Sequence, residues 1–134
     1  MSERARRLAS PLAIGGGVAL VTLALRLRDP HVAGAWGGCP TKLVTDLDCP
    51  LCGGLRAVND LTHLDLGAAL SSNLVLVLAI PVILVLWGRR LVACWRGGPA
   101  MAPLAVPSWV WVTGLVVLGV FTVARNLPGS WLAA

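Results

Sequence analysis

The chain has little charge. Only 13% of its 134 residues are Asp, Glu, Lys or Arg, while 57% are hydrophobic and the mean hydropathy is +0.80. A soluble domain of this length would carry more charge, because about a quarter of the residues in an ordinary globular domain are charged. The composition therefore favours a small integral membrane protein, a single membrane domain over residues 1–134 with no separate soluble part.

A nucleic-acid-binding surface is also missing. The formal net charge is +5, but the basic residues stand at the ends of apolar runs, and no basic face interleaved with aromatic residues occurs. We therefore expect no nucleic acid among the partners of this protein. The placement of the basic residues is instead typical of orientation signals in a membrane protein.

Three apolar runs are long enough to cross a lipid bilayer. A helix rises about 1.5 Å per residue and needs about 20 largely apolar residues to cross the hydrocarbon core. The runs predict spans at about 8–25, 67–88 and 103–124. Each span must be helical, because an unpaired backbone group finds no water inside the bilayer. The predicted fold class is an all-α membrane protein with three transmembrane helices, and the lipid bilayer is its first partner.

The centres of these spans contain no ionisable residue. Proton-coupled transporters and channels with charged filters usually carry one there, so the spans themselves predict no transport chemistry. Pro81 falls in the middle of the second span and predicts a kink at that point. Small residues between Ala13 and Ala19 favour close packing of the first span, within the chain or with a partner.

The basic residues also predict the orientation. Arginines at the N-terminus and in the loop after the second span fall on one side of a three-span arrangement. The positive-inside rule places that side in the cytoplasm. We expect a multi-pass protein of the plasma membrane with a cytoplasmic N-terminus and an extracytoplasmic C-terminus. Residues 27–66 then form an extracytoplasmic loop.

The end of this loop has the pattern of a helix. Leu55, Val58 and Leu61 recur at helical spacing, which predicts a short amphipathic helix lying on the outer membrane surface. Asp65 is a good N-cap residue and stands just before the second span. Asn73, near the outer end of that span, is expected either to bond to a neighbouring helix or to face the interface.

The same loop holds three of the four cysteines, Cys39, Cys49 and Cys52. Cys49 and Cys52 enclose a Cys-Pro-Leu-Cys turn that comes directly before the predicted amphipathic helix. A helix N-terminus lowers the pKa of a nearby thiol, because the helix dipole and the free N–H groups favour the thiolate. The loop is therefore the predicted site of any chemistry.

A longer signature surrounds this turn. It reads Cys49-Pro50-Leu51-Cys52-Gly53-Gly54-Leu55-Arg56-Ala57, with Cys39-Pro40 upstream and with Leu61, Asp65, Ala69 and Asn73 downstream. These residues resemble the CPxCGxxRA signature of DUF2752, a family of small bacterial membrane proteins. Leu55 stands where the family often has Thr, and Leu74 where Pro is common. The resemblance implies the architecture and a site at the cysteines, and it implies no particular reaction.

Three interpretations of the cysteines stay open. In the structural one, Cys39 forms a disulfide with Cys49 or Cys52, as suits an oxidising outer face, although three cysteines leave one unpaired. In the second, the three cysteines with His31 or His63 form a Cys₃His zinc site. The metal-ligand set that we predict is Cys39, Cys49, Cys52 and His63.

The third interpretation is thiol–disulfide exchange. A Cys-Pro-x-Cys turn beside a helix start suits this chemistry, with Cys39 as a resolving partner. Against it, the chain has no thioredoxin-like βαβ pattern, and its only further cysteine, Cys94, falls on the predicted opposite side of the membrane.

The leading hypothesis from the sequence is non-enzymatic. It describes an accessory or assembly subunit of a larger membrane complex, or a homo-oligomer, with a structural CPxC motif and no catalytic residue. The alternative is a metal-binding or redox membrane protein that uses the three cysteines, with zinc as the cofactor. The residues expected to act in structure or interaction are Arg56, Asp60, Asp65 and Asn73. Arg56 is expected to pair with Asp60 or to bond loop carbonyls.

Overall fold

The structure is a computed structural model that describes residues 3–97 and 106–132. These residues form five helices: α1 (Glu3–Leu27), α2 (Pro40–Thr45), α3 (Gly54–Thr62), α4 (Leu66–Trp95) and α5 (Ser108–Arg125). Three of them, α1, α4 and α5, are long and apolar enough to cross a membrane. The prediction of an all-helical membrane protein with three candidate spans is confirmed. The predicted third span begins at 103, and its first residues lie outside the described part of the chain.

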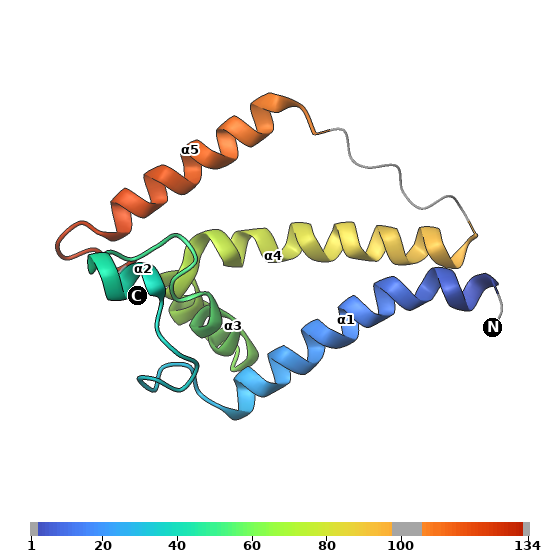
Figure 1. Cartoon of the computed structure of the whole chain (residues 1–134), viewed down its shortest axis with the longest axis horizontal. Coiled ribbons are helices and arrows are strands. Elements are labelled where there is room, and N and C mark those ends of the chain that lie inside the picture. Colours follow the sequence, from blue (N-terminus) through green and yellow to red (C-terminus); the bar gives the residue numbers. More distant parts are fainter. Residues whose placement is uncertain (1–2, 98–105, 133–134) are drawn as a thin grey trace.

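The helices α1 and α4 run in opposite directions and converge at one end (Figure 1). Near that end, Trp87 of α4 donates its indole N–H to the carbonyl of Pro11 in α1, at 3.0 Å. The indole ring lies against Gly15, where a Cβ atom would come within 2.6 Å of it. Gly15 is therefore the small residue that allows the two helices to approach, and this use of the small-residue face lies within the chain.

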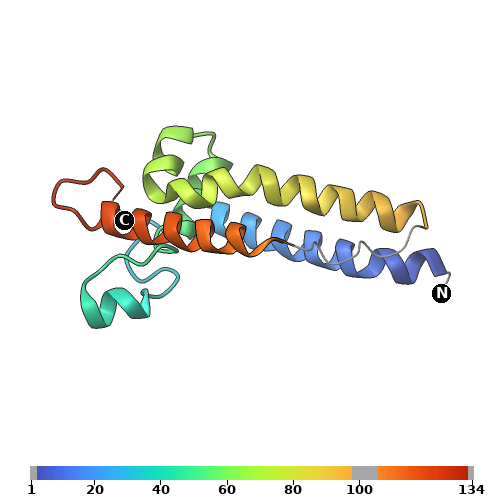
Figure 2. The same ribbon diagram turned by 90° about the horizontal axis from the view of Figure 1, so that it is seen from above.

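At the other end α1 and α4 diverge, and α3 lies between them (Figures 1 and 2). The Asn59 side chain donates to the carbonyl of Leu25 at 2.7 Å, and the Arg26 side chain bonds the carbonyl of Thr62. Asp60 accepts a hydrogen bond from Ser72 of α4 at 2.9 Å. The polar residues Asn59 and Asp60 of α3 are thus buried, while Leu55 is exposed, and the position of α3 on a membrane surface stays a prediction.

The start of α4 differs from the prediction in one respect. Asp65 is its N-cap and accepts a hydrogen bond from the Ala68 amide at 2.9 Å, as expected. The backbone inside α4 leaves the helical conformation at Asn73, with φ −160° and ψ 90°, a break that the sequence did not predict, while the kink expected at Pro81 stays a prediction. The reason is that Asn73 leaves the helical conformation to make contacts with the cysteine loop.

The helix α5 approaches the rest of the protein at its last turn. Arg125 ends the helix, and Asn126 follows it as the C-cap. Both side chains bond the backbone of the loop that contains Cys49. The loop, α3 and the last turn of α5 therefore meet at one end of the molecule, opposite the N-terminus (Figure 1).

Candidate thiol site

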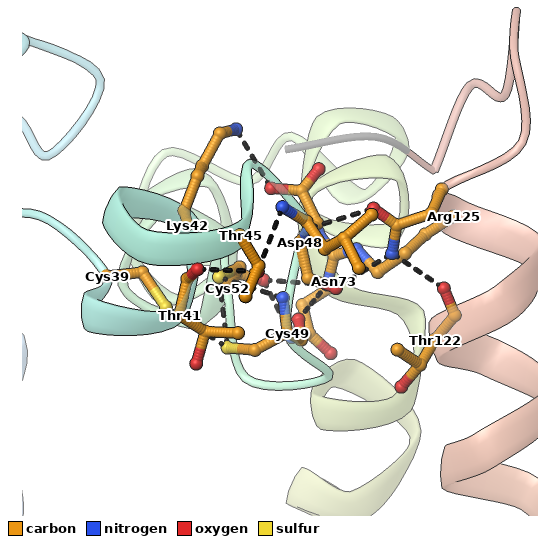
Figure 3. Close-up of polar contacts among 12 residues, drawn as sticks. Cys39, Thr41, Lys42, Thr45, Asp48, Cys49, Cys52, Asn73, Thr122 and Arg125 are labelled. Carbon is orange, nitrogen blue, oxygen red and sulfur yellow. Dashed lines mark hydrogen bonds and ion pairs between the residues drawn. The ribbon is translucent and has the colours of Figure 1, made fainter.

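Three thiols meet in the cysteine loop. The Sγ atoms of Cys39 and Cys49 are 3.4 Å apart, those of Cys49 and Cys52 are 3.0 Å apart, and all three sulfurs lie within 4.8 Å of one another (Figure 3). All four cysteines of the chain are free thiols in the structure. The predicted cluster is confirmed as a group of residues that could hold a metal ion.

Local backbone structure brings the sulfurs together. Cys39 is the N-cap of α2, and Pro40 is the first residue of the helix, a position that suits proline because its φ angle is fixed near the helical value. The turn after Cys49 is closed by a hydrogen bond from the Cys52 amide to the Cys49 carbonyl, at 3.0 Å. Gly53 then caps α3 in the left-handed region, with φ 76°, where a side chain would be strained. The Cys49 amide also points at the Cys52 sulfur, 3.3 Å away.

Two side chains from distant helices hold the carbonyls of this turn. Asn73 of α4 donates to the carbonyls of Pro50 and Cys52, at 3.0 and 3.1 Å. Arg125 of α5 donates through Nη1 to the carbonyls of Cys49 and Cys52, both at 3.0 Å. We call Asn73 and Arg125 the carbonyl clamp. Both side chains are 1% exposed, so the clamp is a buried part of the fold.

Asn73 reaches the turn because of the break in α4. Its side-chain oxygen accepts a hydrogen bond from the Leu76 amide at 2.9 Å, which caps the part of the helix that follows the break. A buried helix break leaves amide groups that need partners. Asn73 therefore satisfies the restarted helix with its oxygen while its nitrogen holds the cysteine turn.

The segment before Cys49 is fixed from the same direction. The Asn126 side chain accepts from the Asp48 amide and donates to the Asp48 carbonyl, both at 2.9 Å. The Asp48 carboxylate is buried and forms an ion pair with Lys42 of α2, at 2.8 Å. The carbonyl clamp and these contacts hold the thiol turn on both sides (Figure 3).

The surroundings shift the pKa values of Cys39 and Cys52 in opposite directions. Hydrogen bonds from the Cys52 thiol and from the backbone at Lys42 lower the pKa of Cys39 to about 6. Burial, followed by the hydrogen bonds of Cys49 and Cys39, raises the pKa of Cys52 to about 12. Of these two thiols, Cys39 is therefore the more acidic and Cys52 the less acidic.

A cleft of about 610 Å³ opens beside the thiols. The three cysteines line it together with glycines of the loop, Trp36 and the side chains of Lys42 and Arg56. The sulfurs are therefore reachable from outside the helices, and a ligand of small-molecule size fits next to them.

Other predicted residues lie apart from the sulfurs. His63 contacts the Asn59 carbonyl through Nδ1 at 2.9 Å, and His31 lies between Asp29 and Asp60, so the three-sulfur group includes neither histidine. The expected pairing of Arg56 with Asp60 is not found in the described part of the chain. The Asp60 carboxylate is instead held by Ser72 and His31, because α3 turns its polar face inward.

Sequence reasoning missed Arg125, Asn126, Lys42 and Asp48. Arg125 directly follows the predicted third span at about 103–124. A signal was present, because an arginine at the predicted outer end of a span runs against the positive-inside rule. Burial against the cysteine turn explains why an arginine stands there.

These features define a helical membrane protein with a three-thiol site at one end of its helices. Residues 39–87 match a protein family described as "Protein of unknown function (DUF2752)". The match confirms the resemblance seen in the sequence, and it contains the three cysteines and Asn73. No curated protein and no solved structure gave a match. Arg125 lies outside the matched residues.

Proposed function

We propose that the protein binds a thiophilic metal ion, zinc in the first place, through Cys39, Cys49 and Cys52. The observation that carries the proposal is the meeting of three sulfurs within 4.8 Å, brought together from two segments of the loop. Thiolates are soft ligands and favour zinc or monovalent copper over the hard cations magnesium and calcium. A membrane-anchored site of this kind would sit at the extracytoplasmic surface of a bacterial plasma membrane.

The spacing of the sulfurs suits a metal. Zinc–sulfur bonds are about 2.3 Å long, so two thiolates of a tetrahedral site stand about 3.8 Å apart. The sulfur of Cys49 lies 3.4 Å from the sulfur of Cys39 and 3.0 Å from the sulfur of Cys52. Binding would therefore separate neighbouring sulfurs by less than about 1 Å, a change within reach of side-chain rotation.

Three protein ligands leave one coordination position for an outside group. Structural zinc sites are closed by four protein ligands, whereas sites that exchange ligands keep one position open. The cleft beside the sulfurs gives such a group access. We propose a non-enzymatic accessory subunit that holds a metal ion at the outer surface and passes it to, or receives it from, a partner in the membrane.

Zinc binding by the detergent-purified protein tests the proposal. Competition with a chromophoric chelator should give one zinc per chain, and substitution by cobalt should give the absorption bands of thiolate ligation. Cys49→Ser and Cys52→Ser should each weaken binding by more than the 10–100-fold typical of losing an outer-shell group. Cys94→Ser is the matched control and should bind like the wild type. Absence of binding by the wild type would reject the proposal.

A second candidate function, thiol–disulfide exchange, is favoured by the low pKa of Cys39 beside Cys49. In this scheme the Cys39 thiolate attacks a disulfide of a partner protein, forming a mixed disulfide and releasing one partner thiolate. Cys49 then loses its proton to solvent and attacks the Cys39 sulfur, which forms a Cys39–Cys49 disulfide and releases the second partner thiolate. The partner is reduced and this protein is oxidised by two electrons. Cys49→Ser should trap the mixed disulfide, and its absence on non-reducing gels would count against exchange.

A further inference from the structure

Arg125 is a buried cation with incomplete bonding. Its side chain is 1% exposed, and its Nη1 atom makes two hydrogen bonds, to the carbonyls of Cys49 and Cys52. Its Nε and Nη2 atoms are buried and find no hydrogen-bond acceptor among residues 3–97 and 106–132. Within the same residues no carboxylate lies at ion-pair distance from it. The guanidinium also lies over the ring of Phe121, 5.1 Å from the ring centroid.

Such a cation calls for a negative charge nearby. Burying an ionised group costs several kcal/mol unless a counter-charge and hydrogen bonds compensate it. The buried carboxylate in this region, that of Asp48, already pairs with Lys42 at 2.8 Å. The remaining source of negative charge in contact with the Arg125 environment is the cysteine turn itself.

The charges of a metal complex supply what is missing. In a complex with a divalent ion, all three cysteines coordinate the metal as thiolates. Three thiolates and one divalent ion carry a net charge of −1, and the guanidinium carries +1 at every accessible pH. The complex together with Arg125 is then neutral, which removes the cost of two uncompensated buried charges.

We infer that Arg125 is the counter-charge and positioning residue of a divalent three-thiolate centre. The inference rests on the proposed metal-binding function. Arg125 touches the carbonyls of two metal ligands and not the metal, so it acts through the ligands that it positions. Asn73 holds the Cys52 carbonyl in the same way but carries no charge, which lets the two roles be separated experimentally.

The experiment compares three substitutions of Arg125 in the full-length protein in detergent micelles. Arg125→Lys keeps the charge, Arg125→Gln keeps a hydrogen-bond donor without the charge, and Arg125→Met keeps only the bulk. Arg26→Gln removes an arginine that also bonds a backbone carbonyl, at Thr62, and is the matched control. The measurements are zinc affinity by chelator competition and the charge-transfer spectrum of the cobalt-substituted site, with circular dichroism to verify folding.

We expect Arg125→Gln and Arg125→Met to weaken zinc binding by about 10–100-fold, the range found when outer-shell partners are removed. Arg125→Lys should recover most of the affinity and the wild-type cobalt spectrum, and Arg26→Gln should match the wild type. Equal affinity in Arg125→Gln and the wild type would overturn the inference, and so would a loss in Arg125→Lys as large as in Arg125→Met. These results leave the proposed function intact, because it fails only when the wild type binds no metal.

Discussion

Both ends of the molecule use an arginine to hold backbone carbonyls, in opposite surroundings. At the end near the N-terminus, Arg7 donates to the carbonyl of Gly97 at 2.8 Å and lies 3.4 Å from Glu3, with its side chain 46% exposed. At the cysteine end, Arg125 holds two carbonyls and is 1% exposed. Water screens and solvates the first contact, so it contributes little. Arg125 is buried, so its positive charge needs a compensating negative charge. In our proposal the metal-bound thiolates supply that charge.

The comparison also separates two meanings of an arginine at the end of a membrane span. Arg7 belongs to a basic group that fits an orientation signal, and any basic residue there serves the purpose. Arg125 also stands at the end of a span, but its Nη1 atom bonds two carbonyls of the cysteine turn in a buried site. The environment of the side chain, rather than its place in the span, distinguishes the two roles.

Zinc-dependent stability should show this difference most strongly. Zinc supplied at 100 times the wild-type Kd should stabilise the wild type and Arg7→Gln by about 2.7 kcal/mol. If Arg125→Gln loses about 100-fold in affinity, the same zinc concentration should stabilise it by only about 0.4 kcal/mol. Thermal unfolding in detergent, with and without zinc, measures these values. Equal stabilisation of Arg7→Gln and Arg125→Gln by zinc would show that Arg125 contributes no more to metal binding than Arg7 does.

The uncharged member of the carbonyl clamp should matter to the metal-free protein. Asn73→Ala leaves the half-buried Pro50 carbonyl without its donor and removes the cap of the Leu76 amide, so we expect a loss of about 2 kcal/mol in the free energy of unfolding. Glu3→Ala breaks the exposed pair with Arg7 and should cost less than about 0.5 kcal/mol. Denaturant titration in mixed micelles measures both, and a similar cost for the two would show that burial of the clamp contributes nothing.

The acidity of Cys39 should appear in its reaction rate. With the pKa lowered from 9.0 to about 6, the thiolate population rises through pH 6 in the folded protein and through pH 9 in the unfolded chain. Because nucleophilicity falls as the pKa falls, alkylation at pH 6 should be about 20-fold faster in the folded state. Iodoacetamide labelling followed by peptide mass spectrometry measures the rate. A midpoint near pH 9 in the folded protein would contradict the proposed environment of Cys39.

The same shift gives the sign of a pH effect on stability. The contribution of Cys39 is fully present above pH 9 and is lost as the pH falls through about 6. Cys52 has the opposite sign, since its contribution is present below pH 9 and is lost as the pH rises toward about 12. The combined contribution of Cys39 and Cys52 to the stability of the folded protein is therefore largest near pH 9.

A smaller effect than that of Asn73→Ala is expected at an exposed contact of the cysteine end. Asp65→Ala removes the N-cap of α4, and caps of this kind contribute about 1 kcal/mol. Asp65→Asn keeps a capping oxygen and should behave nearly as the wild type. Melting temperatures of the two variants measure the effect. If Asp65→Ala lowers the stability as much as Asn73→Ala, the buried position of Asn73 does not explain the larger loss expected there.

Local pattern predicted a large part of this architecture. Length and hydropathy located the three spans, because crossing lipid requires a long apolar helix. The short spacing of Cys49 and Cys52 placed two of the thiols, and the signature with Cys39-Pro40 pointed to the third. Asp65 was recognised as a cap because an N-cap depends on neighbouring residues alone.

Contacts between distant helices could not be predicted in the same way. Arg125 meets Cys49 across most of the chain, and no spacing rule encodes that meeting. Asn73 breaks its helix where its side chain contacts the cysteine turn, and no local pattern around Asn73 predicts this break. The partner of Asp60 depended on which face of α3 turned inward, and the face with Asn59 and Asp60 did so.

Native mass spectrometry of the protein purified without chelator or reductant tests the central claim most directly. The account predicts one zinc ion per chain, with Cys39, Cys49 and Cys52 protected from alkylation until a chelator removes the metal. A metal-free mass that is smaller than the reduced chain by two hydrogens would contradict it, because a disulfide within the cluster would then take the place of the metal site.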